Sequence, residues 1–446
     1  MSYTLIAPTK LQADVTLPAS KSISNRALII SALYGGEPLP QNLSDCDDTE
    51  VVVRALRQLA EGSQDPIDIK AAGTAMRFMT AFLAATPNGQ HQLTGTERMR
   101  HRPIRVLVDA LRHLGADIAY TGEEGFPPLR ITGKTLQGGR TEIAGNVSSQ
   151  YISALLLIGP VLRQGLTLRL TGDIISRPYI DLTLCTMRDF GAKAEWTSVD
   201  TIAVEPKPYV PCDYLIENDW SAASYWFEMV ALSPDPEARV RLHGLMDGSR
   251  QGDSIARYLF SLLGVKTRFA SRQQGQPTTV TLTKSPHRVA RLDYDFSGAP
   301  DLAQTFVVAC CLLGVPFHFT GLQTLRIKET DRIDALQREM LKLGYPLQVT
   351  SNSELSWDGE ILKSPTPELL NSPTPELQNS PTPELQNSRT PELLNPAIDT
   401  YDDHRMALAF AAVCLQRPIT INNPQVVSKS YPHFWDDLRQ AGFRTE

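Results

Sequence analysis

The chain has 446 residues, of which 42% are hydrophobic and 21% are charged, a composition typical of a globular protein with room for two or three domains. Its formal net charge of −6 argues against a nucleic-acid binder, which usually carries a basic excess, but leaves an anionic small substrate open. Apolar runs shorter than about 18 residues argue against a membrane span. Six cysteines without a C-x-x-C pair, and no signal-peptide pattern, favour a cytoplasmic protein.

The N-terminal stretch MSYTLIAPTKLQADVTL predicts an alternating strand that leads into a polar loop. Six later segments predict helices that are buried on most faces, because Ala, Leu, Met and Phe surround nearly the whole helix. A short loop with Ser, Asp, Asn or Gly, which is a helix-start signal, precedes each of them. The six helices begin near Ser20, Ala71, Ser148, Asp219, Ala299 and Tyr401.

Amphipathic helices and alternating strands separate the buried helices. The helices are expected within residues 101–116 and 330–344, and strands within 140–145, 166–172 and 278–283. One loose unit therefore recurs six times, three times before about residue 216 and three times after, which indicates two similar α/β domains. If the buried helices of each domain run parallel, their N-termini converge, and free N–H groups there suit a phosphate or carboxylate.

Polar residues gather at several of these helix starts. Lys21, Ser22 and Arg26 begin the first buried helix, where an anion site and a capped helix with two solvated cations are equally good interpretations. Gly73 precedes another helix and permits close backbone approach to a ligand, although such a glycine is usually only a turn.

The densest charge cluster is RIKETDR at residues 326–332. Glu329 among cations at a loop–helix junction suits a proton shuttle beside an anionic substrate, whereas the ordinary interpretation of such a run is a solvated surface cluster. Thr330 is the expected cap of the following helix, and Asp301 suits a cap in the same way. The sequence contains no Walker A, H-E-x-x-H or G-x-S-x-G motif, so it points to no metal, nucleotide fold or serine nucleophile.

Taken in order, these stretches resemble the enolpyruvyl transferase family, and within it the branch whose acceptor is shikimate 3-phosphate. The resemblance runs through LPASKSISNRALI, SDCDDT, AAGTAMR, GTERMRHRPI, GNVSSQYISALL, SRPYIDLTL, NDWSAASY, APDLAQT, RIKETDR, YDDHRMALAFA and SKSYPHF. Each motif alone is weak, but eleven in register are specific. They span essentially the whole chain apart from residues 364–395.

The resemblance implies a two-domain, inside-out α/β barrel, in which three α/β units per domain surround parallel buried helices and the active site lies in the interdomain cleft. The domains would be residues 19–216, and residues 1–18 together with 217–446. The implied reaction transfers the enolpyruvyl group of phosphoenolpyruvate to the 5-hydroxyl of shikimate 3-phosphate through a tetrahedral intermediate and releases phosphate, on the way to chorismate and the aromatic amino acids. It needs no metal or organic cofactor, and we expect a monomer.

The same resemblance assigns the site residues. Shikimate 3-phosphate would contact Lys21, Ser22, Arg26, Ser148, Ser149, Gln150, Ser176, Tyr179, Asp301, Thr324 and Lys328. Phosphoenolpyruvate would contact Lys21, Gly73, Arg98, Gln150, Arg332, Arg405 and Lys429. The catalytic residues would be Lys21, Asp301, Lys328, Glu329 and His404. Glu329 would protonate the enol methylene and later remove a methyl proton, Asp301 would be the base for the 5-hydroxyl, and Lys21 would share the proton of the leaving phosphate.

Some positions depart from the family pattern. Ala71 and Phe78 stand where Asn and Pro are common, and both flank the expected phosphoenolpyruvate pocket. Thr324 replaces a frequent Asn. Gly73 is kept, and because the family ties a small residue there to room for glyphosate, we expect inhibition by glyphosate. Since the expected cleft cations would repel one another, we also expect an open form that closes around substrate anions.

Two alternatives stay open at this point. One is the sister enzyme that transfers enolpyruvate to UDP-N-acetylglucosamine, although no cysteine here sits in a loop like that enzyme's acid cysteine. The other is an interaction protein that works through four octapeptides, SPTPELLN to SRTPELLN, at residues 364–395. Eight residues cannot bury a core, and each Ser-Pro stops a helical turn. We therefore expect a mostly disordered surface insertion.

Deletion of residues 364–395 should leave the activity within a few-fold of the parent, because loop length costs only about 0.6 kcal/mol per doubling. Phosphate release by the parent and by the deletion variant checks this. A loss above a hundredfold would show instead that the repeat shapes the site through His404 and Arg405, which follow it closely in the sequence.

Overall fold

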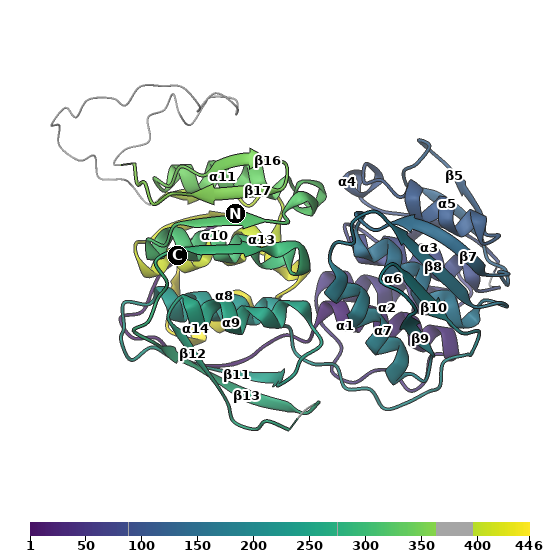
Figure 1. The fold of residues 1–446 in the computed structure, drawn as a ribbon, viewed down its shortest axis with the longest axis horizontal. Coiled ribbons are helices and arrows are strands. Elements are labelled where there is room, and N and C mark those ends of the chain that lie inside the picture. The colour runs from purple at the N-terminus through teal and green to yellow at the C-terminus, as the bar shows by residue number, and fades with distance from the viewer. Residues whose placement is uncertain (88, 274, 363–395) are drawn as a thin grey trace.

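The computed structural model describes residues 1–87, 89–273, 275–362 and 396–446, so the octapeptide repeat lies outside the described residues. Figure 1 shows two lobes side by side. One hydrophobic core draws on residues 19–216, and a second draws on residues 5–17 and 220–443. We call the corresponding parts the first lobe and the second lobe. The two segments that connect the lobes pair with each other at an isolated bridge between Ala19 and Asn218.

All six predicted buried helices are confirmed. The first lobe contains α1, α3 and α6, and the second contains α8, α10 and α13, each buried along most of its length. Their bounds are Lys21–Tyr34 (α1), Gly73–Ala85 (α3), Ser149–Ile158 (α6), Trp220–Leu232 (α8), Ala303–Leu313 (α10) and His404–Ala411 (α13).

A second, less buried helix follows each buried one. These helices are α2 (Asp47–Ala60), α5 (Arg105–His113), α7 (Arg177–Asp189), α9 (Ala256–Leu262), α11 (Arg332–Lys342) and α14 (Phe434–Gln440). The predicted amphipathic helices at 101–116 and 330–344 correspond to α5 and α11. A further short helix, α4 (Glu97–Arg100), lies between α3 and α5.

The strands of the described residues form five four-stranded sheets. Two belong to the first lobe, with the orders β3 (Ile67–Asp68), β4 (Gln90–Thr94), β6 (Leu129–Thr132), β5 (Asp117–Tyr120), and β7 (Gly139–Ala144), β8 (Leu166–Thr171), β10 (Thr201–Val204), β9 (Ala194–Trp196). The first unit of this lobe, built on α1 and α2, departs from the predicted pattern. Between α1 and α2 the described residues contribute no named strand, only an isolated bridge of Gln41 with Leu215.

The second lobe has three sheets. Their orders are β12 (Val265–Phe269), β13 (Pro277–Lys284), β11 (Arg239–Met246), β2 (Gln12–Thr16); then β14 (Leu292–Asp295), β15 (Phe317–Thr320), β17 (Glu354–Trp357), β16 (Gln348–Ser351); and β18 (Ala397–Ile398), β19 (Ile419–Asn422), β1 (Ser2–Ile6), β20 (Arg444–Thr445). The predicted single N-terminal strand is therefore two strands in two different sheets. Pro8, which has no N–H for a sheet ladder, lies in the break between them.

One prediction about a helix cap is wrong, and the alternative interpretation of Asp301 as a cap is excluded. Asp331, not Thr330, caps α11, because its Oδ1 accepts hydrogen bonds from the N–H groups of Ile333 and Asp334 at 3.1 Å. Asp301 does not cap α10, whose N-cap is Leu302. Its carboxylate lies among cations instead, as described below.

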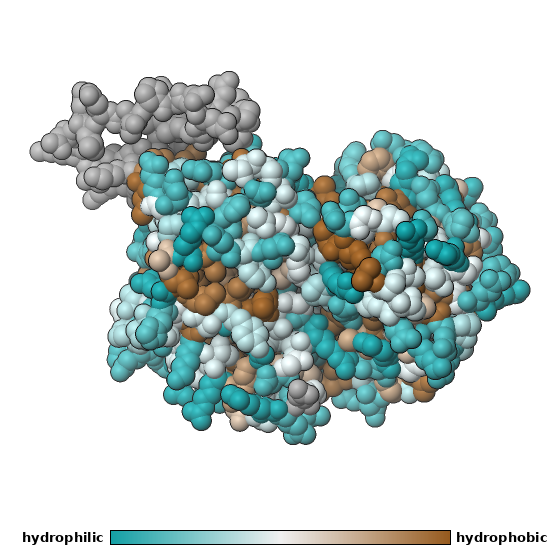
Figure 2. Space-filling model, in the orientation of Figure 1, coloured by the Kyte–Doolittle hydropathy of each residue, from teal (hydrophilic) through white to brown (hydrophobic). Residues whose placement is uncertain are grey.

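On the face that Figure 2 shows, hydrophilic residues cover most of both lobes and apolar residues form smaller patches. Among the described residues, no helix is long and apolar enough to cross a membrane.

Candidate active site

The starts of the buried helices converge on one cavity that both lobes line. Sixteen of the residues predicted from the sequence line it: Lys21, Ser22, Arg26, Gly73, Ser148, Ser149, Gln150, Ser176, Tyr179, Asp301, Thr324, Lys328, Glu329, Arg332, His404 and Arg405. Their sequence positions span nearly the whole chain. The fold therefore gathers into one place the residues that the motifs had singled out.

Two predicted site residues lie elsewhere. Lys429 does not line the cavity but contacts a residue that does, with its Nζ 3.0 Å from Oε1 of Glu329. Arg98 is exposed on α4 and does not line the cavity, so its prediction as a wall residue is not supported. Arg102, four residues later in the same motif, lines the cavity instead. Arg98 lies on the short helix α4, whereas Arg102 follows it in the loop before α5.

The cavity wall is electropositive although the chain as a whole is acidic. Seven cations and four carboxylates line it, an excess of three positive charges against a chain total of −6. Such a cavity concentrates small anions. The cations are Lys21, Arg26, Arg77, Arg102, Lys328, Arg332 and Arg405, and the carboxylates are Asp48, Asp219, Asp301 and Glu329.

Arg332 is the centre of the charged network in the second lobe. Its side chain is only 1% exposed. The guanidinium donates from Nε to Oδ2 of Asp403 at 2.7 Å, from Nη1 to Oδ1 of Asp301 at 2.9 Å, and from Nη2 to Oε2 of Glu329 at 3.0 Å. A buried guanidinium with this many charged partners is rigidly held. It fixes the two proposed catalytic carboxylates relative to each other.

Asp301 and Glu329 are both ionised in this setting. Burial raises the pKa of Asp301, but the cations of Arg405, Lys328 and Arg332 outweigh burial and hold that pKa well below its usual range. Burial acts in the same direction on Glu329, and Lys429 and Arg332 overcome it and lower the pKa well below normal. Both groups can therefore accept protons, and neither carries one at neutral pH.

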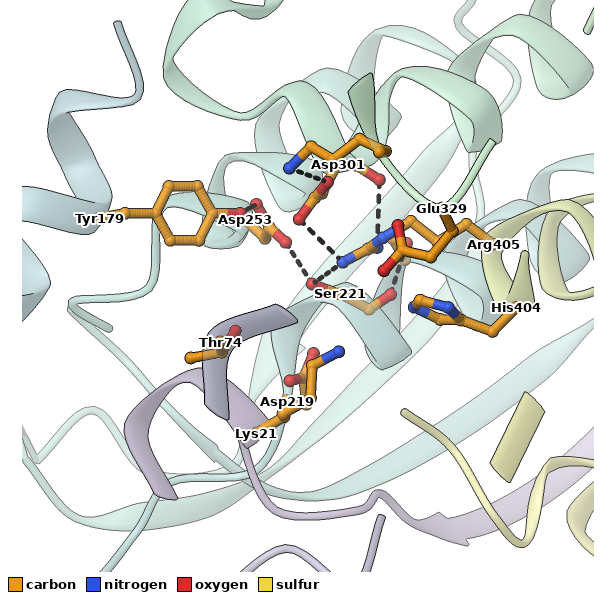
Figure 3. A network of polar contacts seen from close by, with 12 residues as sticks. Lys21, Thr74, Tyr179, Asp219, Ser221, Asp253, Asp301, Glu329, His404 and Arg405 are labelled. Atoms are coloured by element: carbon orange, nitrogen blue, oxygen red, sulfur yellow. Dashed lines mark hydrogen bonds and ion pairs between the residues drawn. The ribbon is translucent and has the colours of Figure 1, made fainter. Parts of the chain in front are cut away.

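Arg405 extends the network along the cavity. Its Nη2 donates to Oδ2 of Asp301 at 3.1 Å and lies 3.5 Å from Oγ of Ser221, and its Nη1 contacts the hydroxyl of Tyr225 at 3.4 Å. Figure 3 shows Arg405 between Asp301 and Ser221. The side chain is 7% exposed, so its contacts are made away from bulk water.

Lys21 faces the cavity from the first lobe. Its Nζ is 3.3 Å from Oδ2 of Asp48, which begins the neighbouring helix α2 and is buried. Burial would lower the pKa of this ammonium, but the Asp48 carboxylate outweighs burial and raises it. Lys21 is therefore a permanent cation at the start of α1, suited to a phosphate oxygen.

Arg26 lies deeper on the same helix and is 3% exposed. It donates to neutral oxygens, among them Oγ1 of Thr183 at 2.7 Å and the carbonyl of Ser22 at 2.7 Å. Burial lowers its pKa to about 10, so it stays charged at neutral pH. Phe78, which differs from the family pattern, is fully buried, and its ring centroid is 5.5 Å from this guanidinium. Phe78 therefore packs against the Arg26 guanidinium through its aromatic ring.

Arg102 forms no ion pair with the residues that the structure describes. Its buried Nε has no hydrogen-bond acceptor among them, and the same holds for Nε of Arg77. Burial and the nearby Arg77 lower its pKa. A Cβ added at Gly73 would lie 2.7 Å from Nη1 of Arg102, so the glycine leaves the room that this guanidinium occupies.

His404 begins α13 and is 1% exposed, and neither ring nitrogen has a hydrogen-bond partner among the described residues. Burial, together with the cation of Lys21, lowers the pKa of His404 well below its usual value. The imidazole is therefore neutral, with one nitrogen able to donate and the other able to accept.

The cavity also contains functional candidates that sequence reasoning missed, namely Asp48, Arg77, Arg102, Asp219, Ser221 and Tyr225. Several stand inside quoted motifs: Asp48 in SDCDDT, Arg102 in GTERMRHRPI and Ser221 in NDWSAASY. The expected repulsion among the cavity cations is partly offset by carboxylates, and the open form that closes around substrates stays a prediction. Lys21, Lys328, Arg332, Arg405 and Lys429 each contact a carboxylate within 3.3 Å.

The chain is similar to known proteins over nearly its whole length. Residues 5–438 match the family model described as EPSP synthase (3-phosphoshikimate 1-carboxyvinyltransferase). The 3-phosphoshikimate 1-carboxyvinyltransferase of Bacteroides fragilis is 55% identical over 444 residues, covering 99% of this chain and 98% of the relative. The enzyme of the same name from Aliivibrio fischeri is 33% identical over 464 residues, covering 98% of this chain and 99% of the relative.

Solved structures share the fold. The EPSP synthase from Acinetobacter baumannii aligns with a TM-score of 0.73 at 20% identity, covering 100% of this chain and 99% of that one. The enolpyruvyl transferase NikO from Streptomyces tendae aligns with a TM-score of 0.69 at 16% identity, with the same coverage. The predicted two-domain, inside-out α/β barrel is thereby confirmed. On the match over nearly its whole length, and on its identity to curated relatives, the chain belongs to the EPSP synthase family.

Proposed function

We propose that the chain transfers the enolpyruvyl group of phosphoenolpyruvate to the 5-hydroxyl of shikimate 3-phosphate and releases phosphate. The hydroxyl oxygen bonds to C2 of phosphoenolpyruvate as a proton adds to C3, which gives a tetrahedral intermediate. The C2–O bond to phosphate then breaks, and a proton leaves the new methyl group. The observation that carries the proposal is the cavity itself: family motifs from both lobes meet at one electropositive wall around two carboxylates, Asp301 and Glu329, which are 19% and 15% exposed.

The arrangement suggests how the substrates divide the cavity. Lys21, Arg26 and the serines that begin α6 face it from the first lobe and suit the phosphate of shikimate 3-phosphate. Arg332 and Arg405 suit phosphoenolpyruvate, and Lys21 is proposed to contact both substrates. Asp301 contacts Lys328 and two arginines, and as an ionised carboxylate it is the proposed base for the 5-hydroxyl.

Phosphate release tests the proposal against the closest rival. The purified chain with phosphoenolpyruvate should release phosphate when shikimate 3-phosphate is the acceptor and none when UDP-N-acetylglucosamine is. Turnover only with the nucleotide sugar would overturn the assignment in favour of the sister reaction. We also propose that the two domains comprise residues 19–216 and residues 1–18 plus 217–446. We propose further that the protein is a monomer and that the reaction needs no metal or organic cofactor.

We propose that Arg102, rather than Arg98, completes the phosphoenolpyruvate site. Arg102→Ala should raise the KM for phosphoenolpyruvate by roughly tenfold to a hundredfold, the range expected for loss of a charge-assisted hydrogen bond. Arg98→Ala is the matched control, because it removes the same charge four residues away on an exposed surface, and its KM should stay within twofold of the parent. Equal effects of the two substitutions in steady-state assays would contradict this assignment.

Gly73 sets the space beside Arg102. The parent should be inhibited by glyphosate in competition with phosphoenolpyruvate, as predicted from the retained glycine. In Gly73→Ala the new methyl group would push the end of the Arg102 side chain aside. Inhibition by glyphosate should then weaken at least tenfold, and the KM for phosphoenolpyruvate should rise. An unchanged inhibition constant in Gly73→Ala would show that residue 73 does not shape the inhibitor site.

A further inference from the structure

Asp253 lies on the short helix η2 (Gly252–Ile255) and is 3% exposed. Its Oδ1 accepts a hydrogen bond from the hydroxyl of Tyr179 at 2.8 Å, and its Oδ2 accepts one from Oγ of Ser221. Tyr179 belongs to α7 in the first lobe, whereas Ser221 belongs to α8 in the second. One buried carboxylate therefore joins the two lobes beside the cavity (Figure 3).

The connection continues from Ser221 into the charged network. Oγ of Ser221 lies 3.5 Å from Nη2 of Arg405, and the same Nη2 donates to Oδ2 of Asp301 at 3.1 Å. Arg405 also donates from Nη1 to the backbone carbonyl of Asp301 at 3.1 Å. A continuous series of contacts thus runs from Tyr179, on the proposed shikimate-phosphate side, to Arg405, on the proposed phosphoenolpyruvate side.

The pKa of Asp253 depends on its burial and on the neighbouring groups of the site. Burial is the largest influence and raises its pKa to about 6, with the carboxylates of Asp301 and Asp219 acting in the same direction. The cation of Arg405 and the hydrogen bond from Ser221 oppose them. Tyr179 stays protonated, because burial and the Asp253 charge raise the pKa of its phenol well above normal.

We propose that Asp253 is a positioning residue that couples the two substrate subsites, by holding Tyr179 directly and Arg405 through Ser221. A substrate that orders Tyr179 then also orders Arg405, so each substrate binds more tightly when the other is present. Such coupling is reciprocal between the two ligands. The proposal rests on the proposed function, since it needs both substrates to bind this cavity.

Initial rates with both substrates varied over a grid test the proposal. They give an interaction factor, the factor by which one saturating substrate lowers the apparent dissociation constant of the other. Asp253→Ala should lower this factor roughly tenfold, toward the value of one that means no coupling, as expected when a hydrogen bond to a charged group is lost. The kcat of this variant should fall much less. Ser221→Ala, which cuts the same connection at its next member, should do the same.

Asp247→Ala is the matched control, because Asp247 lies six residues earlier, between β11 and η2, and pairs with Arg257 at 2.8 Å, outside the cavity lining. Its interaction factor should equal that of the parent. In the parent the factor should also fall as the pH drops through about 6 and Asp253 gains a proton. Asp253→Ala should lack that part of the pH profile, although the substrate phosphates titrate in the same range in both proteins.

The outcomes separate the two proposals. Turnover with an unchanged interaction factor in Asp253→Ala overturns the coupling alone, as does an equal loss in Asp247→Ala. If Asp253→Ala does not fold, Ser221→Ala decides, and a parent-like factor there overturns the coupling. Absence of turnover in the parent overturns the proposed function, and the coupling with it.

Discussion

Glu329→Gln should lower kcat by roughly 10²- to 10⁴-fold, the usual contribution of a positioned acid or base. The KM values for both substrates should change much less, because the amide keeps the shape of the side chain and can still accept a hydrogen bond from Arg332. Single-turnover and steady-state phosphate release measure the two effects separately.

The state of Glu329 gives this prediction a sharper form. The proposed mechanism needs Glu329 to deliver a proton to C3, yet Lys429 at 3.0 Å and Arg332 at 3.0 Å keep it ionised. Both cations are proposed to bind phosphoenolpyruvate. When its anionic groups lie beside these cations, their negative charge offsets the two influences that lower the pKa of Glu329, and burial, which raises it, prevails. Glu329 would thus become an acid only once substrate is bound.

Glu354→Gln is the control for Glu329→Gln. Glu354 pairs with His318 on the surface of the same lobe, 3.3 Å away and outside the cavity. Its kcat should match the parent. A Glu329→Gln variant with more than a tenth of the parental kcat would rule out Glu329 as the main proton carrier and shift attention to the neutral His404.

Arg332→Met should lower the free energy of unfolding by about 3–5 kcal/mol and abolish measurable turnover. Removing one partner from a buried ion-pair network leaves the others without compensation, and here Asp403 at 0% exposure loses both of its side-chain hydrogen bonds from Arg332. Urea unfolding in the absence of both substrates measures the free energy of unfolding, and phosphate release measures the activity.

The pH dependence of stability adds a second measurement. The pKa values of Asp301 and Glu329 are lowered on folding, so their contribution is present above their unfolded values of 3.8 and 4.5 and is lost as the pH falls below them. In Arg332→Met this loss on acidification should be smaller, because one of the cations that lowers both pKa values is gone.

Arg338→Met is the matched control on the same helix. Arg338 is 59% exposed and pairs with Asp334 one turn away at 2.9 Å, an arrangement that usually contributes about 0.5 kcal/mol or less. If Arg332→Met were as stable as Arg338→Met, the network would be unimportant for folding, and its description as a rigid support for the two carboxylates would be wrong.

Much of the fold follows from local sequence patterns. The six buried helices were predictable because apolar residues surround each one and a polar residue precedes it. Ser20 precedes α1 in this way, and Asp219 precedes α8. The sheets of the second lobe were less predictable. Pro8 splits the N-terminal strand, and β1 then pairs with β19 from the far end of the chain, as in the pair Tyr3 and Ile421. Such long-range pairing leaves little local signal.

The site was predictable wherever a motif places its charged residue at the start of a buried helix. Side-chain direction was not predictable in the short segment that holds both Arg98 and Arg102, so the sequence did not show that Arg102, and not Arg98, lines the cavity. Asp253 was missed for a different reason. A lone Asp in a loop carries no pattern, and its role depends on contacts with Tyr179 and Ser221 from two other parts of the chain.

Enolpyruvyl transfer breaks the C2–O bond of phosphoenolpyruvate, whereas phosphoryl transfer would break its P–O bond. Phosphoenolpyruvate with ¹⁸O in the bridging position, incubated with shikimate 3-phosphate and the full chain, tests this directly, with ³¹P NMR or mass spectrometry of the released phosphate. Enolpyruvyl transfer predicts that the label leaves with the phosphate, because the bridging oxygen stays on phosphorus. Label found in the carbon product instead would mean that the P–O bond had been broken, and it would contradict enolpyruvyl transfer.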